Sequence, residues 1–80
     1  NYPNPFNPTT NIQYDLPLDN FVSIKIFDIT GREITTLVNE FKTAGRYSAG
    51  FNGADLSSGI YYYKIEAGNF SQVRKMLLLK

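Results

Sequence analysis

The chain has 80 residues, enough for one small domain that buries only about 60% of the surface its unfolded chain exposes. A hydrophobic content of 42% with 19% charged residues is typical of a folded domain, and a net charge of +1 argues against a nucleic-acid binder. The absence of cysteine excludes disulfides and thiolate metal sites, and the longest apolar run, "MLLL", is far shorter than the ~20 residues that span a bilayer.

The first stretch, "NYPNPFNPTT", holds three of the four prolines. Proline has a fixed φ and no N–H, so it is confined to edge strands and extended segments. We therefore predict that residues 1–10 are an extended, proline-rich leading segment, with Tyr2 and Phe6 as anchors along a sheet edge. The chain starts without methionine or a signal segment, so Asn1 is expected to be a domain boundary in a longer protein.

Period-two alternation then predicts strands over residues 11–16 and 21–27. The apolar side chains that would face the core in these two strands are Ile12, Tyr14, Leu16, Val22, Ile24 and Ile26. A turn is predicted in "DITGRE", where Asp28 can bond the local backbone and Gly31 accepts a positive φ. Residues 34–38 would return as the antiparallel hairpin partner.

Three more strands are predicted in "RYSAGF", "IYYYKIEAG" and "NFSQVRKMLLLK". The residues expected to face the core in the first two are Tyr47, Ala49, Phe51, Tyr61, Tyr63 and Ile65. The last strand should pair with the one before it across a turn at residues 67–69. Alternation leaves open whether Met76 and Leu78 or Leu77 and Leu79 face inward.

These strands and the leading segment together predict an all-β fold for residues 1–80, an immunoglobulin-like β-sandwich of about seven antiparallel strands without a disulfide. Catalytic groups are scarce, because the chain has neither His nor Cys. Carboxylates in turns commonly bond backbone amides, so no catalytic, cofactor-binding or metal-binding residue is expected. The acidic pairs weighed were Asp15 with Asp19, Asp28 with Glu33, and Asp55 with Glu66, and the calcium ligands weighed were Asp19, Asn20, Asp28 and Asp55.

Five stretches together resemble one family: "NYPNPFNPTT", "KIFDITGREITTLV", "AGRYSAGFNG", "LSSGIYYYKIEAG" and "KMLLLK" look like the C-terminal sorting domain of the type IX secretion system, type A. The resemblance implies a non-catalytic immunoglobulin-like domain at the C-terminus of proteins exported by Bacteroidetes and related bacteria. It also implies an N-terminal cargo domain in the same chain, recognition by an outer-membrane translocon, and a secreted or cell-surface location. A sortase-like peptidase often removes such domains and attaches the cargo to surface lipopolysaccharide.

The family's motifs are matched along the whole chain. The matching residues, expected to serve folding or recognition, are Pro3, Asn4, Pro5, Phe6, Gly31, Gly45, Tyr47, Gly59, Tyr61, Tyr63, Lys75, Met76, Leu78 and Lys80. We hypothesise that the last strand, residues 73–80, contacts the translocon by edge pairing. The alternative is that this strand only completes the sheet.

Two other functions remain open. One is a structural or adhesive immunoglobulin-like module, similar to the hook-capping domain of flagellar assembly proteins. The other is a carbohydrate-binding module that uses Tyr62 or Tyr14. Because side chains alternate along a strand, "YYY" leaves only Tyr62 facing outward, and one ring makes a poor sugar platform.

Overall fold

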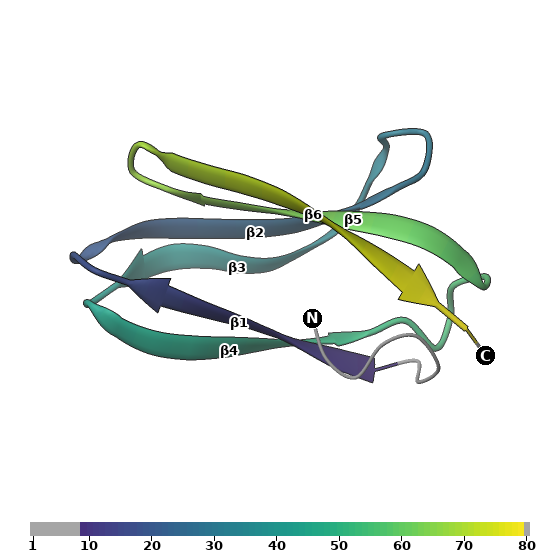
Figure 1. Cartoon of the computed structure of the whole chain (residues 1–80), viewed down its shortest axis with the longest axis horizontal. Coiled ribbons are helices and arrows are strands. Elements are labelled where there is room, and N and C mark those ends of the chain that lie inside the picture. Colours follow the sequence, from purple (N-terminus) through teal and green to yellow (C-terminus); the bar gives the residue numbers. More distant parts are fainter. Residues whose placement is uncertain (1–8, 80) are drawn as a thin grey trace.

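The computed structural model describes residues 9–79, which form six antiparallel strands in two sheets (Figure 1). The strands are β1 (Thr9–Leu16), β2 (Asn20–Asp28), β3 (Glu33–Lys42), β4 (Gly45–Asn52), β5 (Gly59–Ala67) and β6 (Phe70–Leu78). β1 and β4 form a two-stranded sheet, which packs against a four-stranded sheet in the order β3-β2-β5-β6. The predicted all-β sandwich is confirmed.

The predicted number of about seven strands is wrong for the described residues, which hold six. The seventh was counted from the leading segment, of which only Thr9 and Thr10 are described, and both belong to β1. β1 lies between Pro8 and Pro17, because every residue from Thr9 to Leu16 has an N–H to donate to the ladder. The predicted anchoring by Tyr2 and Phe6 lies outside the described residues.

The predicted hairpin of β2 and β3 is confirmed, but β3 is longer than expected and continues to Lys42. Its pairing with β2 shifts register between Ile24 and Lys25 and again between Ile26 and Phe27. Each irregularity inserts an extra residue and breaks the period of two. The sequence of β3 therefore lacks the clean alternation that identified the other strands.

Two corners carry the chain between the sheets at the same end of the sandwich (Figure 1). The β1–β2 corner contains Pro17 and Asp19, and the β3–β4 corner contains Thr43 and Ala44. The Asp19 carboxylate accepts a hydrogen bond from the Ala44 backbone N–H at 2.7 Å. This bond joins corners that lie far apart in the sequence.

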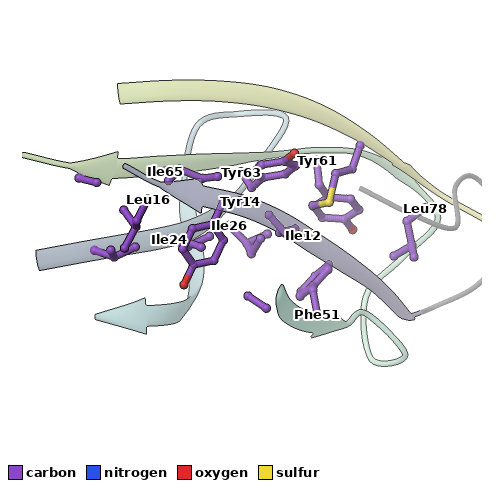
Figure 2. Close-up of a cluster of buried hydrophobic side chains, with 14 residues drawn as sticks. Ile12, Tyr14, Leu16, Ile24, Ile26, Phe51, Tyr61, Tyr63, Ile65 and Leu78 are labelled. Atoms are coloured by element: carbon purple, nitrogen blue, oxygen red, sulfur yellow. The ribbon is translucent and has the colours of Figure 1, made fainter. Parts of the chain in front are cut away.

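The core fills the space between the two sheets (Figure 2). Its buried side chains come from five strands: Ile12, Tyr14, Leu16, Val22, Ile24, Ile26, Ala49, Phe51, Tyr61, Tyr63, Ile65, Ala67, Met76 and Leu78. All core-facing residues predicted from alternation are buried except Tyr47, which is half-buried. The choice left open in the last strand is also settled, since Met76 and Leu78 face inward.

The two sheets differ in width. Neighbouring strands lie about 4.8 Å apart, so a two-stranded sheet covers roughly half the width of a four-stranded one. β3 therefore contributes only half-buried side chains, namely Ile34, Leu37 and Val38. At the opposite edge the first half of β6 is also left uncovered, and a groove opens there beside β1.

Candidate recognition surface

The motif turn between β2 and β3 is organised by one carboxylate. Oδ1 of Asp28 accepts hydrogen bonds from the backbone N–H of Thr30 at 2.9 Å, its hydroxyl at 2.6 Å and the N–H of Arg32 at 3.0 Å. The hydroxyl bond is the main cause that lowers the pKa of Asp28 below its ordinary 3.8. Gly31 has a φ of +89°, which side chains with a Cβ rarely adopt. The turn residues thus serve the local backbone.

Two Gly-x-Tyr motifs open β4 and β5 in the same way. Gly45 and Gly59 have φ values of +152° and +154°, and two residues later a tyrosine hydroxyl donates to the carbonyl oxygen four residues before it. The bonds run from Tyr47 to Thr43 at 2.6 Å and from Tyr61 to Ser57 at 2.7 Å. The arrangement is similar to the tyrosine corner of immunoglobulin-like domains. Each motif fixes a chain crossing between the sheets.

The two tyrosines have different surroundings. Tyr61 is only 8% exposed and lies opposite Met76 on the neighbouring strand. Tyr47 is half-buried and stacks on Tyr14, with the ring centroids 5.5 Å apart, while the ammonium of Lys42 lies 4.8 Å from the Tyr47 ring centroid. The first tyrosine thus belongs to the core, and the second belongs to an aromatic and cationic cluster at the surface.

Burial perturbs two further core tyrosines. Desolvation raises the pKa of Tyr14 and of Tyr63, and for Tyr63 the nearby Arg74 guanidinium opposes the effect. Both phenols are therefore neutral at ordinary pH, as buried hydroxyls must be to avoid the cost of an isolated charge. These two side chains contribute to the packing of the core.

β6 is an edge strand of the four-stranded sheet, and among the strands of residues 9–79 it pairs with β5 alone. Met76 and Leu78 turn into the core, with exposures of 4% and 6%. The residues that alternate with them are exposed. We use the name outer row for four of these exposed residues, three from β6 and one directly after it: Val73, Lys75, Leu77 and Leu79. Its three apolar members are 58%, 40% and 40% exposed in chain order.

The outer row continues across the sheet as an apolar patch. Leu77 lies opposite Ile60 and Lys75 opposite Tyr62, and Tyr62 in turn lies opposite Phe27 of β2. Ile60, Tyr62 and Phe27 are half-buried because they cover one another. Sequence reasoning singled out Met76 and Leu78 and missed Leu77 and Leu79, which only the direction of the strand could identify as exposed.

Other motif and candidate residues are dispersed. Pro3, Asn4, Pro5, Phe6 and Lys80 lie outside the described residues. Three of the acidic side chains lie beside a basic one: Asp15 lies 3.7 Å from Arg46, Glu33 lies 3.8 Å from Lys25, and Glu66 lies 3.6 Å from Lys64. Within the described range 9–79, no three His, Cys, Asp or Glu side chains gather as metal ligands would.

The fold and this surface define a small immunoglobulin-like β-sandwich module with β6 at the edge of its larger sheet. Residues 1–79 match the secretion system C-terminal sorting domain. The chain belongs to this family, the sorting domains of type IX secretion. Such a domain is a C-terminal signal that interacts with the type IX machinery and takes an N-terminal cargo across the outer membrane, to the cell surface or the extracellular space.

No curated protein and no solved structure is significantly similar to the chain. In residues 9–79 there is no helix long and apolar enough to cross a membrane.

Proposed function

We propose that the domain delivers its cargo by presenting β6 to the outer-membrane translocon of the type IX system. The match to the sorting-domain family over residues 1–79 carries this proposal. The position of β6 at the edge of its sheet supports it, because an edge strand is where a partner strand can add to a sheet through main-chain hydrogen bonds. Val73, Lys75 and Leu77 of the outer row lie on this same strand and Leu79 directly follows it, so the row adds three apolar side chains and one lysine to this surface.

The outer row suits recognition better than the inward residues of the motif. Met76 and Leu78 are fully engaged in the core, so a partner could contact them only after the sandwich opened. Leu77 and Leu79 are both 40% exposed, and Lys75 is exposed beside them. Burying these apolar groups against a partner would contribute favourable free energy at about 25 cal/mol per Å².

Later steps belong to other proteins in this proposal. A sortase-like peptidase removes the domain after export and attaches the cargo to the cell surface. The domain itself contributes no catalytic group in this proposal, in keeping with a sequence that has neither His nor Cys. Nucleic acid is not a proposed partner, because the net charge is only +1.

An export assay tests the role of β6. The chain is fused to the end of a fluorescent reporter in a host with the type IX system, and reporter in the medium and at the cell surface is measured. Leu77→Ser with Leu79→Ser should abolish export. The matched control is Phe21→Ser with Phe41→Ser, an exposed aromatic pair across β2 and β3, which should leave export intact.

Thermal melting of both double variants accompanies the export assay and shows whether they fold. Export by the β6 variant at the unaltered level would contradict the role of the outer row. Equal loss of export in both folded variants would show that the translocon does not distinguish this strand from the rest of the sheet.

The carbohydrate-binding and adhesive alternatives find no specific observation in their favour. Tyr62 is half-buried in the apolar patch, and Tyr14 is stacked on Tyr47, so neither offers a free ring face as a platform.

A further inference from the structure

Three lysines lie on the outer face of the four-stranded sheet, one on each of three neighbouring strands. Lys25 of β2 lies opposite Lys64 of β5. Lys64 lies opposite Val73 of β6, so Lys75, two residues further along β6, is its diagonal neighbour. Like charges directly opposite each other destabilise a sheet, and nearby carboxylates therefore decide which of these charges is compensated.

Lys75 is the lysine of this face that has no carboxylate beside it. Lys25 lies 3.8 Å from Glu33, and Lys64 lies 3.6 Å from Glu66. Three cations elsewhere in the chain each have a carboxylate oxygen at 3.7 Å or less: Arg32, Lys42 and Arg46. Within residues 9–79 the ammonium of Lys75 makes neither an ion pair nor a hydrogen bond. Its charge is balanced by solvent alone.

This uncompensated charge lies among apolar side chains. Val73 and Leu77 flank Lys75 on the same face of β6 and are 58% and 40% exposed, and Tyr62 lies directly opposite Lys75 on β5. A partner that covers the outer row removes the ammonium from water together with these neighbours. Burial favours the apolar groups, but a cation that loses its hydration without a countercharge is strongly disfavoured. A purely apolar partner would therefore bind this surface poorly.

The spacing of the outer row determines where the groups of a partner must lie. Alternate side chains along a strand are about 6.7 Å apart. A partner strand presents its side chains with the same period, whether it pairs beside β6 or packs over the outer face. If a carboxylate of that strand meets Lys75, the residues two positions away on either side meet Val73 and Leu77. Those two residues must be apolar to bury their counterparts.

We propose that the outer row is bound by an extended segment of the export machinery in which one Asp or Glu lies between two apolar residues, each two positions away. The carboxylate accepts a hydrogen bond from the ammonium of Lys75, and the apolar residues pack on Val73 and Leu77. The inference rests on the proposed role of β6 in export and adds the chemistry of the segment that β6 meets. The ion pair supplies specificity, because a segment with an apolar or basic central residue leaves the charge of Lys75 uncompensated.

Substitutions of Lys75 in the reporter fusion test for the carboxylate. Lys75→Met has a similar length and extends the apolar row, and it should lower the rate of export roughly tenfold, an effect between those of an exposed and a buried ion pair. Lys75→Glu should reduce export to background, and Lys75→Arg should export at nearly the unaltered rate. The matched control is Lys25→Met, on the same face two strands away, which should leave export unaltered. Unaltered export by Lys75→Met or Lys75→Glu would overturn the proposal, since a partner without the carboxylate accepts an apolar residue there at least as well as a lysine.

The failure of this proposal can be told apart from a failure of the role of β6. If Leu77→Ser with Leu79→Ser leaves export intact, the outer row is not the contact and both proposals fail. If that double variant abolishes export and the Lys75 variants do not, only the partner carboxylate is contradicted. Lys75 is exposed, so its variants are expected to fold, which thermal melting checks.

Chemical cross-linking examines the partner segment directly. A carbodiimide joins a lysine amine to a carboxylate that touches it, with no spacer between them. In exporting cells it should link Lys75 to an Asp or Glu that has apolar residues two positions away on both sides, as read by mass spectrometry of the linked peptides. The absence of a link at Lys75, or a link to a carboxylate within a polar segment, would also overturn the proposal.

Discussion

The Tyr61→Phe substitution examines the tyrosine hydrogen bond that opens β5. It removes one oxygen and keeps the ring, which is 8% exposed in the core, so packing is preserved. The lost bond runs to the Ser57 carbonyl at 2.7 Å in a partly buried setting. Phenylalanine leaves that carbonyl without its donor, and water has poor access to it.

The expected decrease in the free energy of unfolding has two sources, the lost hydrogen bond and the carbonyl group left without a donor. A typical hydrogen bond contributes about 1 kcal/mol net, and a buried group left unsatisfied costs about 1–3 kcal/mol. We expect a loss of about 1–2 kcal/mol, since the Ser57 carbonyl is only partly buried. A chain of 80 residues unfolds with an entropy of about 170 cal/mol/K, so Tm should fall by roughly 6–12 °C.

Tyr47→Phe and Tyr62→Phe are the matched controls. The bond from Tyr47 to Thr43 is exposed, so water replaces the hydroxyl and the cost should stay below about 1 kcal/mol. Tyr62 lies on the outer face, and its substitution should change stability by less than about 0.5 kcal/mol. Thermal and urea unfolding followed by circular dichroism measure all three. A Tyr61→Phe effect no larger than that of Tyr62→Phe would refute the structural role of this bond.

Two further outcomes are expected. Leu78→Ala should cost about 2–5 kcal/mol in urea unfolding because it opens a core cavity, whereas Leu79→Ala, at a 40% exposed position, should cost about 0.5 kcal/mol or less; similar costs would contradict the inward direction of Leu78. The lowered native pKa of Asp28 means that its contribution to stability is complete above the ordinary value of 3.8 and is lost as pH falls from there through the native pKa. Asp28→Asn should therefore reduce the loss of unfolding free energy as the pH is lowered below 3.8. If the unfolding free energies of the variant and the unaltered chain fall in parallel with pH, this explanation is contradicted.

Local patterns predicted the strands where alternation was strict. Ile24 and Ile26 in β2 and Tyr61 and Tyr63 in β5 face the core as expected, because a one-residue shift would move these side chains to the outer face. β3 was predicted too short, since two register irregularities remove the period on which the prediction depends. The last strand was ambiguous because apolar residues occupy both of its faces.

Features that depend on long-range contacts could not be predicted from the sequence. Nothing local shows that β1 pairs with β4, or that the two-stranded sheet leaves part of β6 uncovered. The hydrogen bonds of Tyr47 and Tyr61 were also missed, although one cue was present: both tyrosines follow a glycine by two residues directly after a polar loop. The sequence does not distinguish whether the motif glycines and tyrosines serve folding or recognition. In the described chain, the hydroxyl groups of Tyr47 and Tyr61 make local hydrogen bonds that stabilise the fold.

Because side chains alternate in β6, the outward position of Leu77 depends on the complete folding of the domain. Met76 and Leu78 can be buried only when the sandwich has closed, and the same pleat then presents Leu77 to the outside. A molecule that has failed to fold displays no ordered row on this strand. If the translocon recognises that row, binding to this one short strand selects domains that have folded completely. Misfolded domains are then not exported, and no separate proofreading factor is needed.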